Sequence, residues 1–171
     1  GGTGSQYVPP TQGFFVMGAT AGIGPFALTN AAKSHMSGNL FYKSEDPSIV
    51  IIEANGQKYK DQTWVRFNEQ ENAAYDGQTD VDKIISVSNP ELPQIFTNIE
   101  NKRMTINSMP QTSTVPMGFT AVSSGTFTIN APQTGLCTKV TLEDLFNGTM
   151  TDLLTSSYTF TYTAGDQENR F

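Results

Sequence analysis

Acidic residues crowd into positions 69–82, where no lysine or arginine occurs. Calcium takes about six to eight oxygen ligands from carboxylates, amides and backbone carbonyls, and a flexible acidic loop can supply them. The spacing does not follow the EF-hand pattern, so two interpretations stay open: a calcium site and a solvated acidic loop. The candidate calcium ligands are Glu69, Glu71, Asp76, Asp80 and Asp82.

Nucleophilic catalysis has few residues available, because the chain contains one histidine, His35, and one cysteine, Cys137. A serine or cysteine nucleophile needs a nearby base and a third group that orients the base. Ser34 and His35 are adjacent in the sequence, and no Gly-x-Ser-x-Gly elbow is present. One histidine and one cysteine also fall short of a structural zinc site. We therefore expect a surface-loop histidine and a buried, unreactive thiol.

Paired carboxylates are the remaining route to catalysis, since a glycosidase places two of them about 5 to 9 Å apart across a cleft. Glu143 and Asp144 join the five acidic residues named above as candidates. A chain with a net charge of −6 produces such pairs by chance. We therefore expect no enzymatic activity and no cofactor apart from the calcium already considered.

Aromatic side chains give a second binding hypothesis. Sandwich modules bind glycans by stacking flat rings on sugar faces, and Trp64, Tyr59 and Tyr75 are the candidates for such stacking. In an all-β protein most aromatic rings instead fill the core or cover a sheet face. Trp64 alternates with apolar neighbours, so it either faces water or packs beneath a loop.

Composition narrows the class of protein. The 171 residues include 10 Lys and Arg against 16 Asp and Glu. Nucleic acids and anionic membrane surfaces require a concentrated basic patch, so we expect neither as a partner. No apolar run reaches the length of about 18 residues that a membrane-spanning helix requires, so we expect no membrane insertion. The 11 Phe and 6 Tyr favour pleated sheets over helices.

Strand patterns recur about every ten residues, as in sandwiches and barrels. Residues 157–163 alternate aromatic residues with threonine, and residues 49–52 form an apolar run typical of a central strand covered on both faces. Residues 30–36 have room for one or two helical turns. The expected strands are 13–17, 26–29, 49–53, 63–67, 83–87, 94–97, 103–106, 118–122, 126–129, 138–142 and 157–163.

Turn residues separate these strands. Asn147-Gly148 and Asn55-Gly56 predict hairpins with type I′ turns, in which both central residues take positive φ. The prolines, including Pro132, are expected between strands, where a missing amide proton costs least.

The patterns together predict an all-β, two-layer antiparallel β-sandwich with Greek-key, jelly-roll or immunoglobulin-like connections. Residues 1–5 are expected to be a disordered lead or linker, and residues 6–171 one sandwich domain. The chain starts without a methionine or a signal segment, so we expect a fragment of a larger protein.

Short segments along the chain also match a known order. They are YVPPTQGFFV (7–16), LTNA (28–31), FYK (41–43), WVRF (64–67), AYD (74–76), DVDK (80–83), PQIFT (93–97), VPMGF (115–119), LEDL (142–145), YTF (158–160) and NRF (169–171). In this order they resemble a β-sandwich region that precedes the C-terminal sorting domain in type IX secreted and surface proteins of Bacteroidota. The family commonly continues beyond NRF, and the sorting domain itself is not in this sequence.

The resemblance implies a location and an architecture but no catalytic residues. It predicts a non-catalytic structural or adhesive module, secreted and held at the cell surface. The alternative is a carbohydrate-binding module that serves an enzyme in the same polypeptide. The implied partners are other domains of that polypeptide, a polysaccharide or a surface protein.

Overall fold

The computed structural model describes residues 27–32 and 47–171. The chain divides into a smaller unit, residues 2–44, and a larger unit that holds residues 45–171. In the smaller unit the described residues contain one 3-10 turn, η1 (Asn30–Ala32). This turn lies within the segment expected to form one or two helical turns, whereas residues 27–29 are not a strand. The expected strand 13–17, the predicted domain boundary at residue 6 and His35 lie outside the described residues.

The larger unit is built from strands, and its described residues include no α-helix. The strands are β1 (Ile49–Asn55), β2 (Lys60–Phe67), β3 (Val81–Asp82), β4 (Gln94–Ile99), β5 (Lys102–Met109), β6 (Met117–Thr120), β7 (Gly125–Gln133), β8 (Thr141–Asp144), β9 (Thr149–Asp152) and β10 (Tyr158–Tyr162). The all-β class predicted from composition and alternation is confirmed.

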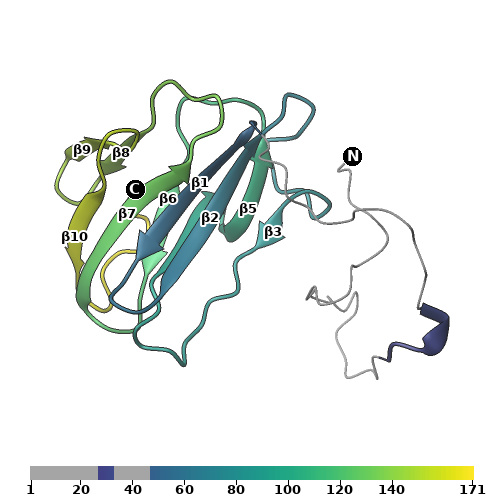
Figure 1. The fold of residues 1–171 in the computed structure, drawn as a ribbon, viewed down its shortest axis with the longest axis horizontal. Coiled ribbons are helices and arrows are strands. Elements are labelled where there is room, and N and C mark those ends of the chain that lie inside the picture. The colour runs from purple at the N-terminus through teal and green to yellow at the C-terminus, as the bar shows by residue number, and fades with distance from the viewer. Residues whose placement is uncertain (1–26, 33–46) are drawn as a thin grey trace. The chain divides into compact units, whose positions relative to one another are not determined.

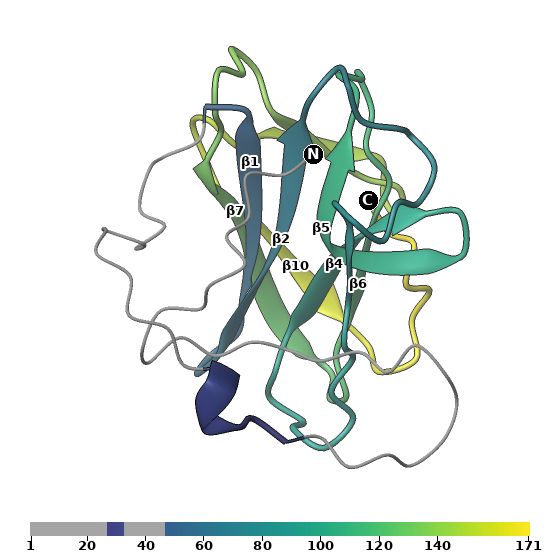
Figure 2. The same cartoon turned by 90° about the vertical axis from the view of Figure 1, so that its right-hand side faces the viewer.

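One curled sheet carries most of these strands, in the order β10-β7-β1-β2-β5-β4-β6, and β3 pairs with β5 (Figures 1 and 2). β8 and β9 form a separate two-stranded sheet beside it. β1 lies between β2 and β7 and its residues 50–54 are buried, as expected for a central strand covered on both faces. β2 and β5 are paired parallel, the one departure from antiparallel order among the described pairings.

Aromatic residues show how the sheet curls over its own core. The Phe119 ring on β6 lies 4.9 Å from Phe127 on β7. It lies 5.0 and 5.2 Å from Phe160 and Tyr162 on β10, at the other end of the strand order. The two ends of the sheet therefore face each other across one apolar core, which gives the two layers of a sandwich.

The C-terminal segment covers the edge of this sheet. Met117 and Phe171 exchange backbone hydrogen bonds of 2.8 and 3.2 Å, and the Phe119 amide donates to the Glu168 carbonyl. In the same segment, the Arg170 carbonyl accepts a hydrogen bond from the amide of Leu145, the residue that follows β8. Four residues thus join the main sheet to the β8–β9 hairpin and hide the open edge of β6.

Three local predictions for the larger unit were wrong, in addition to the strand expected at 26–29. Both Asn-Gly pairs lie where the chain passes from one strand to its paired neighbour, Asn55 as the last residue of β1. Asn147, Asn55 and Gly56 do not have positive φ, so neither turn is type I′. Residues 145–148 instead form a four-residue loop in which Gly148 alone takes a positive φ, 71°. Residues 83–87 are not a strand, since β3 ends at Asp82. Pro132 lies inside β7, where the register with β1 shifts and no regular ladder bond is lost.

Candidate functional site

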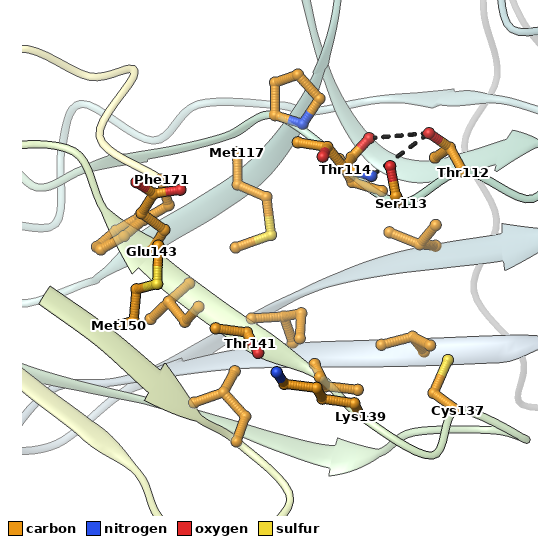
Figure 3. A pocket seen from close by; sticks show the side chains of 18 of the residues that line it. Thr112, Ser113, Thr114, Met117, Cys137, Lys139, Thr141, Glu143, Met150 and Phe171 are labelled. Carbon is orange, nitrogen blue, oxygen red and sulfur yellow. Dashed lines mark hydrogen bonds between the residues drawn. The ribbon is translucent and has the colours of Figure 1, made fainter. Parts of the chain in front are cut away.

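A pocket of about 530 Å³, here called the slot, opens at one end of the larger unit. Its floor is formed by apolar residues of β1 and β2, one wall by the loop that leads into β6, and the other by the segment that enters β8 (Figure 3). Its lining comprises Val50, Ile52, Val65, Phe67, Thr112, Ser113, Thr114, Val115, Pro116, Met117, Cys137, Lys139, Val140, Thr141, Leu142, Glu143, Leu145, Met150, Leu153 and Phe171.

Polar groups of the slot lie along its rim. Thr112, Ser113 and Thr114 face Lys139 and Cys137 across the opening at one end (Figure 3). The Thr112 hydroxyl donates to the Thr114 carbonyl at 3.3 Å and accepts from the Thr114 amide at 3.4 Å, which fixes this small turn. The rim therefore offers hydroxyls and one ammonium group above an apolar floor.

Two charged side chains line the slot. Lys139 and Glu143 are exposed, and neither has an ion pair or hydrogen bond among the residues that the structure describes. Glu143 lies at the end occupied by Met150 and Phe171, away from Thr112 and Ser113 (Figure 3). Cys137 is a free thiol in the lining that packs against the core and is partly buried, not the fully buried thiol that was expected.

A buried ion pair holds the hairpin wall in place. Asp144, at the end of β8, is fully buried and Arg170 is 6% exposed. Arg170 Nε and an Nη donate to the Asp144 carboxylate at 3.0 and 2.7 Å, and the other Nη donates to the Thr161 carbonyl at 3.1 Å. The guanidinium lies 4.4 Å from the centre of the Phe160 ring, a cation–π contact.

Further donors complete the shell of Asp144. The Tyr158 hydroxyl donates to its carboxylate at 2.6 Å, and the Phe146 amide donates at 3.0 Å. Burial works to raise the pKa of Asp144, but the hydrogen bonds from Arg170, Tyr158 and Phe146 outweigh it and hold the pKa below its ordinary value of 3.8. Asp144 is therefore a charged structural anchor. It is no proton donor for a partner such as Glu143, so this carboxylate pair does not form an acid–base pair.

These contacts give the matching sequence segments a physical meaning. LEDL supplies Asp144, YTF supplies Tyr158, and NRF supplies Arg170 and most of the segment that covers β6. In VPMGF, Gly118 faces the ring of Phe96 so closely that an added Cβ would lie 2.2 Å from it. These four segments serve packing and edge pairing.

The candidate calcium ligands are mostly engaged within their own loop. Asp80 is buried and accepts from the Ser108 and Asp76 amides, each at 2.8 Å, and Asp76 accepts from the Gln78 amide at 2.9 Å. Asp80 therefore anchors the loop to β5.

The other three carboxylates are spread along the loop. Glu69 accepts from the Gln111 amide and Glu71 from Asn68, each at 3.3 Å. Asp82 contacts Lys102 at 4.0 Å. In the described part of the chain no three acidic, histidine or cysteine side chains form a group that fits a metal ion.

The candidate sugar-stacking rings lie in three different settings. Trp64 lines a second, shallow depression together with Lys60, Asp61, Gln62, Thr105 and Ile106, and its indole donates to Gln62 at 3.3 Å. Tyr59 is 44% exposed in the loop between β1 and β2. Tyr75 lies under Lys102, whose ammonium is 3.6 Å from the ring centre. Trp64 lines this depression, and the other two rings do not contribute to it.

Sequence reasoning missed the slot because its parts are far apart along the chain. Residues 112–114 lie outside every expected strand, and Lys139 lies in the expected strand 138–142, which in the structure begins only at Thr141. The fold alone brings these residues together. Arg170 had a detectable signal, since it is a lone arginine that follows the strand-like run of residues 157–163. A buried arginine requires an acidic partner, but which of the many carboxylates it contacts depends on the sheet closure.

The comparisons with known proteins bear on family alone. Among the described residues no helix is long and apolar enough to cross a membrane. No curated protein and no solved structure matches the chain. One family model, a domain of unknown function (DUF8693), matches residues 1–171. The chain therefore belongs to the DUF8693 family.

Proposed function

We propose that the chain is a non-catalytic structural or adhesive module of a secreted bacterial cell-surface protein, exported by the type IX system. One observation carries the proposal: the most deeply buried carboxylates of the described chain hold the fold together. Asp144 binds Arg170, Asp80 binds backbone amides, and Glu53 binds Lys60 at 3.0 Å. Carboxylates that are committed in this way are not free for acid–base chemistry.

The resemblance of the segment order to regions upstream of type IX sorting domains supports the location. The partners of such a module are the other domains of its polypeptide or a molecule on a neighbouring surface. The function is then exerted by the outer faces and loops of the sandwich.

Surface proteolysis tests this proposal in the organism that encodes the chain. An antibody raised against residues 47–171 should label intact cells, and external protease should remove the label. Inactivation of the type IX translocon should retain the protein in the periplasm. A protein found in the cytoplasm, or exported normally without the translocon, contradicts the proposal.

The depression around Trp64 favours a second candidate function, carbohydrate binding. It combines one flat indole with the polar side chains of Lys60, Asp61, Gln62 and Thr105, the mixture that sugar sites use. Affinity electrophoresis in gels that contain bacterial, plant or host polysaccharides tests it. Retardation by one glycan should be lost in Trp64→Ala and kept in Tyr59→Ala, whose ring lies outside the depression. If the unmodified chain, Trp64→Ala and Tyr59→Ala have equal mobility in every gel, the carbohydrate-binding hypothesis is contradicted.

A further inference from the structure

We propose that the slot binds a single-chain amphiphile with an anionic head, such as a fatty acid, with the aliphatic chain over β1 and β2 and the head beside Lys139. This inference concerns a site separate from the Trp64 depression, and it does not depend on how the protein is exported.

The size and lining of the slot fit an aliphatic chain. Its volume of about 530 Å³ lies within the range of small-molecule pockets, about 300 to 1,000 Å³. Val50, Ile52, Val65 and Phe67 form a floor without polar side-chain atoms. Water finds few hydrogen-bond partners on such a floor, whereas each buried methylene of a ligand gains about fourfold in affinity.

The rim selects the head group. Lys139 lines the slot and has no carboxylate partner among the described residues. Four other lysines of the described chain, Lys58, Lys60, Lys83 and Lys102, form ion pairs. Hydroxyls of Thr112 and Ser113 lie across the opening from Lys139 (Figure 3). A carboxylate or similar anion there would gain a charge-assisted hydrogen bond from the ammonium group.

The opposite end fixes the orientation of the ligand. Glu143 lies there beside Met150 and Phe171 (Figure 3). The Glu143 carboxylate repels an anionic head group, whereas the Met150 thioether and the Phe171 ring can pack against an apolar tail. The charges at the two ends therefore favour one direction of binding, with the anionic head at Lys139.

Titration calorimetry of the 171-residue chain with decanoate, dodecanoate and tetradecanoate, each below its micelle concentration, tests the proposal. We expect one ligand per chain and a Kd that falls about 15-fold for each two methylenes. The single cysteine gives an independent readout, because Cys137 lines the slot. Dodecanoate should slow its alkylation by iodoacetamide. Absence of both binding heat and protection overturns the proposal.

Matched variants locate the ligand. Thr141→Trp places a large ring at an exposed lining position of β8 and should abolish binding, whereas Thr149→Trp, on β9 and outside the lining, should leave it unchanged. Circular dichroism and thermal unfolding show whether both variants are folded. A folded Thr141→Trp protein that binds dodecanoate normally overturns the proposal, since the ligand then lies elsewhere.

The head-group assignment has its own control. Lys139→Gln should weaken dodecanoate binding about fivefold and leave the binding of neutral dodecanol unchanged. Lys58→Gln, at an exposed lysine paired with Glu91, should affect neither ligand. If Lys139→Gln weakens both ligands equally, or neither, the anionic head is not at Lys139 and the proposal fails in that part.

Discussion

Arg170 and Asp144 connect the last residues of the chain to β8, and both are almost fully buried. Breaking a buried pair on one side leaves an uncompensated charge, which costs about 3 to 5 kcal/mol. Arg170→Met should therefore lower the free energy of unfolding by that amount in urea titrations. Adding Asp144→Asn should recover part of the loss, because the amide oxygen still accepts from Tyr158 without carrying a charge.

The exposed pair of Arg103 and Glu168 provides the control for Arg170. Its side chains are 43% and 36% exposed and their contact is 2.6 Å. Exposed ion pairs contribute about 0 to 1 kcal/mol, so Arg103→Met should change the unfolding free energy by no more than this. Equal losses in Arg103→Met and Arg170→Met would mean that burial of the Asp144 pair carries no special weight.

Gly118 faces the ring of Phe96, which leaves no room for a side chain at this position. A methyl group at this position would lie 2.2 Å from a ring carbon of Phe96, and Phe96 is fully buried and cannot move aside freely. Gly118→Ala should therefore destabilise the protein by about 1 to 3 kcal/mol, as overpacking does. Thermal unfolding measures the loss. At Gly125 the nearest atom is 3.5 Å away, so Gly125→Ala should be tolerated, and a similar loss there would contradict the steric argument.

The edge of β6 is covered by a segment of four residues, and this cover is an element with its own local stability. The Met117 and Phe119 amides donate to the carbonyls of Phe171 and Glu168. In a chain that ends at Gln167 these two amides should exchange with deuterium much faster than those of β1, measured by NMR. The bare edge should also promote concentration-dependent self-association, measured by sedimentation.

The variant Arg170→Met tests whether the backbone pairing of residues 168–171 with β6 depends on the ion pair with Asp144. It removes the guanidinium but keeps the backbone of residues 168–171, so the Met117 and Phe119 amides should stay protected relative to global unfolding. Fast exchange in Arg170→Met would instead mean that the side chain of Arg170, and not the backbone pairing, holds the segment on β6.

Sequence patterns located most strands of the larger unit, because alternation and apolar runs depend on neighbouring residues alone. Residues 49–53, 94–97 and 157–163 each coincide with a strand within two residues at either end. Which strands pair with one another could not be predicted from the sequence patterns. The parallel contact of β2 with β5 joins residues about forty positions apart, and no local pattern encodes such a partner.

The binding surfaces were harder to predict than the strands. Trp64 was identified from its residue type, and the structure places it in a depression. The slot was missed, because it depends on segments far apart in the sequence that meet only when the sheet curls and the hairpin is anchored by Asp144. The acidic loop was visible as a charge run, but its carboxylates are separated by the backbone amides and side chains to which they bind.

Acid stability depends on carboxylates distributed through the whole larger unit. Burial works to raise the pKa of Glu53, but hydrogen bonds from Gln62 and Lys60 outweigh it and lower the pKa below its ordinary value of 4.5. The pKa of Asp144 is likewise lowered from 3.8. A lowered folded-state pKa means that the unfolded chain binds protons first, so this stabilisation is complete above the ordinary values and is lost as pH falls through the folded ones.

The free energy of unfolding, measured in urea at pH 7, 5, 4 and 3, should therefore receive a nearly constant contribution from Glu53 and Asp144 down to pH 5 and a falling one below about pH 4.5. Each group can add at most about 1.4 kcal/mol per pH unit to the slope. Glu53→Gln should flatten the acid limb, because it removes one titrating group. Parallel acid limbs for the unmodified chain and Glu53→Gln would show that Glu53 titrates alike in both states and does not link the fold to pH.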